Sequence, residues 1–312
     1  MSDNGENDTT YLQLLKEHDT VNLDEYTFAG NVVFCAVGSG SGCLMAGMLA
    51  NRFNTSIIIA VTINIGGKIR VGDIFKDAKC INDGSKAGDC VWYIPGGSRQ
   101  AGRPDRPETI NHYRTHDFIE KVTRDLNIGV VWVVPEPDAT PEDISNLITA
   151  GLNQFGSPEP TLVGVNQGMN IYPSNESYSD APVFDALMST SYPISMLIIG
   201  MGTDGRVPMQ KLLSEWGNVV SQMNNTHNVC RVEDICGIID DITYEMQMSC
   251  PAKGRTYDYF AEAAKLHERE PNAVMQVQRP WHRNDEGPVL PVGLMKVVFV
   301  FTPKPKKSAR KR

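Results

Sequence analysis

Five consecutive small residues form the stretch of this sequence with the clearest capacity for chemistry. They are Gly38, Ser39, Gly40, Ser41 and Gly42. Glycines permit positive φ angles and the close approach of a ligand, and the first N–H groups of a helix have no partner within that helix. Backbone amides in this arrangement bind phosphates and carboxylates. The stretch therefore predicts an anion- or nucleotide-binding loop, while a tight crossover that needs small residues is an equally open interpretation.

Two familiar phosphate-binding motifs do not fit this loop. No Gly-Lys-Ser/Thr sequence closes it, which excludes a Walker loop. A dinucleotide-binding fingerprint carries an acidic residue about 20 positions after its glycines, where this chain has the apolar run Ile57-Ile58-Ile59. The loop by itself therefore leaves the ligand undefined.

The hydrophobic pattern predicts the strands and helices that would position this loop. Apolar, β-branched runs predict strands, and apolar residues three or four positions apart predict helices. The predicted strands are Val32–Val37, Ser56–Asn64, Cys90–Ile94, Gly129–Val134, Thr161–Val165 and Ser195–Gly200. Helical patterns lie between them near residues 44–53, 108–126, 141–155 and 181–190. This alternation predicts an α/β fold with a doubly wound, mainly parallel, Rossmann-like sheet.

Ligands bind such sheets at the carboxyl ends of the parallel strands. The loops predicted to meet there are Gly38–Gly42, Ile65–Arg70, Asn166–Asn170 and Gly200–Arg206. For a bound anion, Asn166 and Asn170 would supply neutral hydrogen bonds, whereas Asp204 would supply an acceptor and Arg206 a positive charge. Together with the five loop residues they form the predicted ligand-binding set. No catalytic residue, metal ligand or cofactor is assigned.

The chain divides into three predicted segments. Residues 1–29 form a polar leader with a short helix near 11–18, residues 30–302 form a single α/β domain, and residues 303–312 form a basic disordered tail. From about residue 208 to 302 the domain is predicted to be a mostly helical cap. Its elements are helices at Met209–Met223, Val232–Met248 and Tyr257–Glu268 and a closing strand at Lys296–Phe301. The segment Arg70–Asp89 has no clear period and is interpreted as a functional excursion or a lid.

Composition and charge narrow the classes of function. The net charge is −8 and the pI about 5.3, so nothing in the overall charge favours nucleic acid or a membrane surface. No apolar run approaches the ~20 residues of a spanning helix, and the first eight residues are unlike a signal peptide. We therefore expect a cytoplasmic protein. The tail 304–312, KPKKSARKR, is an exception with three open interpretations: a nuclear import signal, a contact with an anionic partner such as nucleic acid, and a solubilising end.

Several other residues have both a chemical and a structural interpretation. Seven cysteines without a CxxC pair predict reduced thiols. Cys43 would be a nucleophile if the helix start lowered its pKa, although a small packing residue is the preferred interpretation. His112 and His116 have the spacing of a metal pair on a helix, but without a third ligand a hydrogen-bonding pair is preferred. The segment 96–106 is interpreted either as a flexible cationic loop that closes over an anion or as ordinary surface.

The loops also resemble an uncharacterised, mainly prokaryotic family known as domain of unknown function 1152. The resemblance covers roughly residues 30–210 and rests on the glycine-rich first loop, a middle strand ending near Gly168, and the run from Gly200 to Gly205, GMGTDG. The family pattern has an acid after the first loop, two aspartates after the middle strand and a glutamate after the third motif. This chain has Cys43, Asn166, Asn170 and Arg206 at those positions. The resemblance thus implies the fold and a site that has lost most of its carboxylates, and it implies no established activity.

Three hypotheses about function remain. The first is a non-catalytic or weakly catalytic binder of an anionic, nucleotide-like small molecule at the strand ends. The second is a structural or assembly subunit, a pseudoenzyme that forms homo-oligomers, because acid–base catalysis and metal binding need carboxylates that asparagine cannot replace. The third is a hydrolase or transferase that uses Asp204 or Cys43.

Overall fold

The computed structural model describes the elements of one large sheet and the helices around it. The described residues are 20–21, 26–28, 30–38, 40–63, 69–82, 90–101, 115–155, 159–168, 180–203, 212, 228–232, 256–277, 288–296 and 298–302. The helix predicted at 11–18, the basic tail 304–312 and nearly all of the helices predicted at 209–223 and 232–248 lie outside these ranges.

Ten strands form the main sheet in the order β1-β9-β12-β8-β7-β2-β3-β6-β5-β4. Their bounds are Thr20–Val21 (β1), Val32–Ala36 (β2), Ile57–Val61 (β3), Lys79–Asn82 (β4), Cys90–Ile94 (β5), Gly129–Val134 (β6), Thr161–Gln167 (β7), Ile194–Ile199 (β8), Asn228–Val232 (β9) and Val298–Thr302 (β12). Only β5 and β12 run against the other strands of this sheet. The predicted doubly wound, mainly parallel α/β fold is therefore confirmed.

The parallel centre of the sheet has a reversal in its strand order. Along the chain β2, β3 and β6 are added on one side, and β7 and β8 are then added on the other side of β2. Numbered by appearance, these five strands have the order 3-2-1-4-5, as in dinucleotide-binding folds. The reversal lies between β2 and β7, and in open α/β sheets ligands bind outside the strand ends at such a point.

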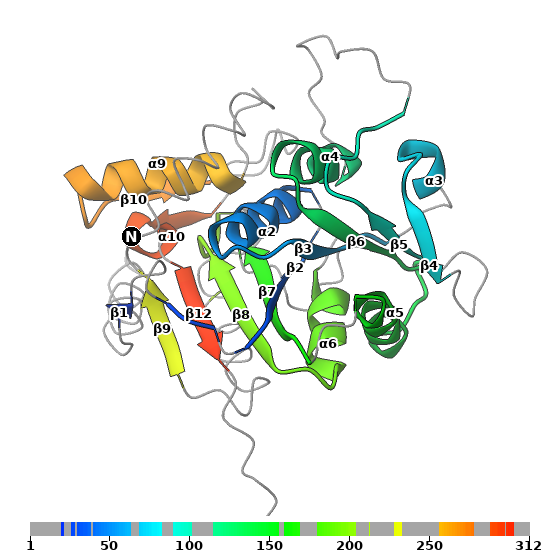
Figure 1. Ribbon diagram of the computed structural model, residues 1–312. Coiled ribbons are helices and arrows are strands. Elements are labelled where there is room, and N and C mark those ends of the chain that lie inside the picture. Colours follow the sequence, from blue (N-terminus) through cyan, green and yellow to red (C-terminus); the bar gives the residue numbers. More distant parts are fainter. Residues whose placement is uncertain are drawn as a thin grey trace, which may run out of the picture.

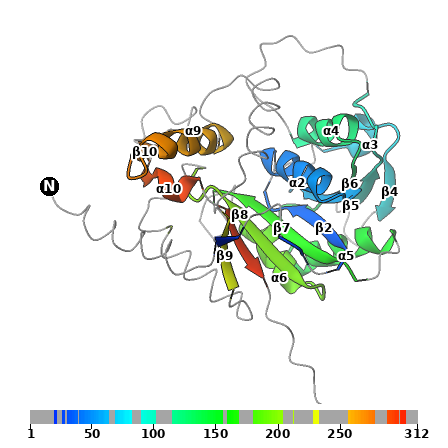
Figure 2. The ribbon, with the colours of Figure 1, turned by 60° about the vertical axis from the view of Figure 1, so that its left-hand side comes forward.

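Helices cover both faces of this centre, as Figures 1 and 2 show. Helices α2 (Ser41–Arg52) and α4 (Thr115–Asp125) pack on one face, and α5 (Pro141–Asn153) and α6 (Ala181–Ser189) pack on the other. Successive strand residues point to opposite faces, so Phe34 packs on the α2 side and Cys35 on the α5 side. Because both faces are covered, these strands are apolar throughout, and each large side chain buried there contributes about 1.5–3 kcal/mol.

Helix α5 shows how local sequence sets an element boundary. Thr140 accepts a hydrogen bond from the Asp143 amide at 3.1 Å, and the Asp143 carboxylate accepts one from the Thr140 amide at 2.9 Å. Pro141 occupies the first turn, where its missing N–H costs no hydrogen bond. The predicted helix start is therefore confirmed as a reciprocal capping box.

The segment after β3 departs from the simple alternation of strand and helix. Residues 70–89, for which no period was evident, contain the short helix α3 (Val71–Ile74) and strand β4. Strand β4 pairs antiparallel with β5, which pairs antiparallel with β6, so a hairpin extends this edge of the sheet. Four residues are too few to show periodicity, which explains why the sequence pattern missed both elements.

The C-terminal region completes the sheet as well as adding helices. Helix α9 (Thr256–Arg269) and strand β12 confirm the predicted helix and closing strand. Helix α10 (Val292–Met295) packs against α9, and the pair β10 (Val274–Gln276) and β11 (Val289–Pro291) lies with them (Figure 2). Strand β9 was not predicted, and the helix expected from Val232 is wrong at that residue, which ends a strand. Strand β12 lies between β8 and β9.

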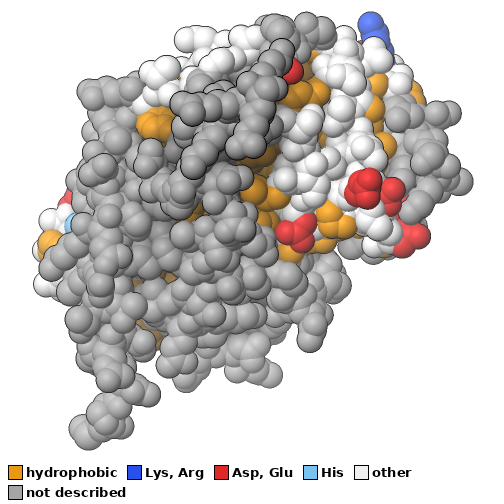
Figure 3. Space-filling model, turned by 90° about the horizontal axis from the view of Figure 1, so that it is seen from below, with side chains coloured by type: hydrophobic (Ala, Val, Ile, Leu, Met, Phe, Trp, Pro, Cys, Tyr) orange, Lys and Arg blue, Asp and Glu red, His pale blue; other side chains and the backbone are white. Residues whose placement is uncertain are grey.

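The surface of the described part is mixed in character. Seen from below, acidic side chains gather on one side of the molecule beside exposed hydrophobic side chains (Figure 3), in keeping with the acidic net charge. No helix among the described residues is long and apolar enough to cross a membrane.

Candidate functional site

The carboxyl ends of β2, β7 and β8 lie side by side and are joined by backbone hydrogen bonds. The Val37 amide donates to Val165 O at 2.9 Å, and the Gly168 amide donates to Ile199 O at 3.0 Å. Of the predicted ligand-binding residues, Gly38, Gly40, Gly42 and Asn166 are brought to this edge, and Ser41 is the first residue of α2. Ser39, Asn170, Asp204 and Arg206 lie outside the described residues. The structure therefore describes the predicted site residues only at the carboxyl ends of β2 and β7 and at the start of α2.

Asn166 ties the two central strands together. Its side chain is fully buried, and its amide Nδ2 donates to Val37 O at 3.0 Å and to Asp180 Oδ2 at 2.9 Å. An asparagine amide has two N–H groups, so both donors are used within the protein. Asn166 positions the end of β2 and the carboxylate of Asp180, and its N–H groups do not point to a ligand.

Asp180 is a residue of the site that sequence reasoning missed. A Cβ atom built at Gly38, where φ is +117°, would lie 2.7 Å from Asp180 Oδ2 and 3.0 Å from Oδ1. Glycine is required at position 38 both because of this φ angle and because the carboxylate fills the space. The signal was present as Asp180-Ala181-Pro182, a helix-start pattern at the end of the loop after β7. The Asp180 side chain makes no capping bond to α6 and contacts the glycine loop instead.

Helix α2 begins without a side-chain cap. Its N-cap is Gly40, with φ +73°, and no acidic residue occurs in its first turn. Gly40 fits closely against α4, since a Cβ atom there would lie 3.4 Å from Phe118 Cε2. Helix α5, in contrast, has two acidic residues in its first turn. The positive end of the α2 dipole is thus not compensated by the helix's own side chains.

The predicted loop Gly200–Arg206 is described as far as Thr203, and this part is packed against the C-terminal region. Gly200, Met201, Gly202 and Thr203 are all buried. A Cβ atom at Gly200 would lie 2.6 Å from Phe260 Cδ2 of α9, and one at Gly202 would lie 2.4 Å from Leu290 Cδ1 of β11. Both glycines also have positive φ, at +62° and +78°. These glycines are therefore explained by backbone conformation and by contact with the C-terminal region, toward which β8 points in Figure 1.

Cys43 is a packing residue and not an activated nucleophile. Its side chain is fully buried in the cluster beneath α2 and α4. Burial disfavours the thiolate and raises the pKa of Cys43 to about 12, with a smaller lowering effect from the Gly40 backbone. The alternative of a depressed pKa at the helix start does not hold, because desolvation outweighs the hydrogen bond from the loop, and the preferred interpretation of Cys43 as a packing residue agrees with its burial.

This raised pKa predicts how stability depends on alkaline pH. The folded pKa lies above the ordinary value of 9.0, so the contribution of Cys43 is fully present below pH 9 and is lost between pH 9 and about 12. Relative to Cys43→Ala, the wild type should lose up to about 1.4 kcal/mol of unfolding free energy per pH unit above 9. Urea denaturation of both proteins at pH 8 and pH 10 measures the difference. Parallel losses in the two proteins would contradict it.

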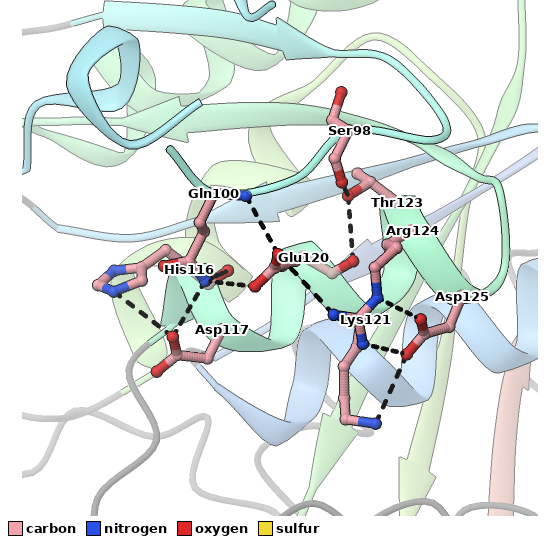
Figure 4. A network of polar contacts seen from close by, with 9 residues as sticks. All are labelled: Ser98, Gln100, His116, Asp117, Glu120, Lys121, Thr123, Arg124 and Asp125. Carbon is pink, nitrogen blue, oxygen red and sulfur yellow. Dashed lines mark hydrogen bonds and ion pairs between the residues drawn. The ribbon is translucent and has the colours of Figure 1, made fainter. Parts of the chain in front are cut away.

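The segment 96–106, interpreted as a flexible cationic loop or as ordinary surface, is described up to residue 101 and makes several hydrogen bonds there. Gln100 Nε2 donates to Asp117 Oδ1 at 3.0 Å and to Glu120 Oε2 at 2.9 Å, and the Gln100 amide donates to Glu120 Oε1 at 3.1 Å (Figure 4). Ser98, which is buried, donates to Asp77 Oδ2 at 2.6 Å. These hydrogen bonds tie the described part of the segment to α4 and to Asp77, and the local sequence does not reveal these acceptors.

Of the two histidines considered as a metal pair, the structure describes only His116. His116 lies in the first turn of α4, with Nε2 3.6 Å from Asp117 Oδ1, while His112 lies outside the described residues. Within the described part of the chain, no group of three or more His, Cys, Asp or Glu side chains could hold a metal ion. Cys35, Cys43, Cys80 and Cys90 are free cysteines.

The geometry provides a glycine-rich loop, an uncapped helix start and a fixed carboxylate at the reversal of strand order. These groups can bind an anion and accept a hydrogen bond or a cation. Comparison with known proteins adds no family assignment: no protein-family model matches the chain, and neither a curated protein nor a solved structure matches it.

Proposed function

We propose that this protein binds an anionic, nucleotide-like small molecule at the carboxyl ends of β2 and β7. The observation that carries the proposal is the start of α2, which has a glycine N-cap and no first-turn acid and follows the strand at the reversal of strand order. Uncompensated amides at a helix start attract phosphate and carboxylate groups. Ligand sites of doubly wound sheets lie at this topological position.

The ligand class follows from the groups that surround the loop. The amides after Gly40 favour a negatively charged group, and Asp180 offers acceptor oxygens close to Gly38. A nucleotide carries both phosphates and sugar hydroxyls, so it complements both features. The loops after β7 and β8 carry the other predicted ligand-binding residues. These are Asn170 in the loop after β7, and Asp204 and Arg206 in the loop after β8. Binding rather than catalysis is proposed, since Cys43 is buried with a raised pKa.

A charge introduced at the helix start tests the proposal. Nucleotides or phosphate at about a hundred times their dissociation constant should stabilise the wild type by roughly 2.7 kcal/mol. In Ser41→Asp the new carboxylate would repel the ligand, so this stabilisation should be lost. The same carboxylate favours the helix dipole, so the unliganded variant should melt at or slightly above the wild-type temperature. Differential scanning fluorimetry with ADP, ATP and inorganic phosphate measures both effects.

A matched control places the same charge at the far end of the same helix. Asn51 is exposed near the C-terminus of α2, so Asn51→Asp should retain the ligand-induced shift in melting temperature. If none of the three probes shifts the melting temperature of the wild type, the proposed function is wrong.

A second candidate function is a structural or assembly subunit. It is favoured by the way the chain's own groups fill the strand ends: Asp180 lies against Gly38, and Phe260 and Leu290 lie against Gly200 and Gly202. In this case the glycines serve packing alone, and the protein would act through association with further copies. Multi-angle light scattering should then show a defined homo-oligomer. A monodisperse monomer at micromolar concentration would contradict this second function.

A further inference from the structure

We draw no further inference here: the strongest candidate, the side-chain cluster of Cys80, Trp92 and Cys90 on one face of the β4–β5 hairpin, carries no ligand or redox assignment, because the described residues show neither a group that the buried indole N–H of Trp92 would bind nor a bond between the two sulfur atoms.

Discussion

Asn166→Asp should destabilise the protein by about 3–5 kcal/mol at pH 8, the cost of an uncompensated buried charge. The substitution replaces the N–H donors toward Asp180 Oδ2, at 2.9 Å, and Val37 O, at 3.0 Å, with a second carboxylate. The position has no access to solvent, so water cannot screen the repulsion. Urea denaturation monitored by circular dichroism measures the loss.

The pH dependence of this loss distinguishes repulsion from poor packing. Two carboxylates that share a buried site cannot both stay ionised at low cost. The variant therefore binds a proton more readily when folded than when unfolded, and its deficit relative to wild type should shrink as the pH falls from 8 to 6. Asn153→Asp makes the same change at an exposed position of α5 and should alter stability by less than about 0.5 kcal/mol. A deficit independent of pH would show that the lost hydrogen bonds alone are responsible.

Gly38→Ala should cost about 2–4 kcal/mol of unfolding free energy through two separate effects. Its φ of +117° is a conformation that residues with a Cβ atom rarely adopt, and the new methyl group would lie 2.7 Å from Asp180 Oδ2. Because the carboxylate is tied to buried Asn166, it cannot move away without breaking that hydrogen bond. Thermal and chemical denaturation of the purified variant measure the cost.

A double-mutant cycle separates the two effects of Gly38→Ala. In the background of Asp180→Ala the steric contact disappears and the strained φ remains, so the substitution should cost about 1–2 kcal/mol less there. Gly42→Ala is the control from the same loop, since its nearest neighbour would be Ala36 Cβ at an ordinary 3.9 Å. Gly42 lies within α2, and alanine there should leave stability unchanged or raise it by up to about 1 kcal/mol. Equal losses at the two glycines would contradict the role assigned to Asp180.

The sequence predicted well those elements whose signals are local. Apolar, β-branched runs gave β2, β3, β6, β7 and β8 close to their observed bounds, because a strand covered on both faces leaves no room for polar residues. Thr140, Pro141 and Asp143 marked the start of α5 through contacts within a few residues of one another. Strand β12 was equally clear, while α3 and β4 were too short to carry a periodic signal.

The candidate site was only partly predictable, because local sequence patterns do not show contacts between residues far apart in the chain. Residue types and strand ends indicated Gly38–Gly42 and Asn166 as neighbours in a doubly wound sheet. The hydrogen bond from Asn166 to Val37, however, joins residues 129 positions apart, and no local pattern reveals it. Cys43 likewise had the sequence position of a reactive thiol, and only burial beneath α2 and α4 showed that its pKa is raised.

The sequence by itself determined the class of fold and the glycine loop at its first helix, because periodicity and backbone freedom are properties of neighbouring residues. Only the tertiary structure decided the strand order, which puts the reversal at β2 and β7. It also decided that a carboxylate from the start of α6 lies against Gly38, at a site where the loop sequences themselves indicated a loss of acids. Pairing of distant strands fixes such contacts, and that pairing depends on packing across the whole sheet.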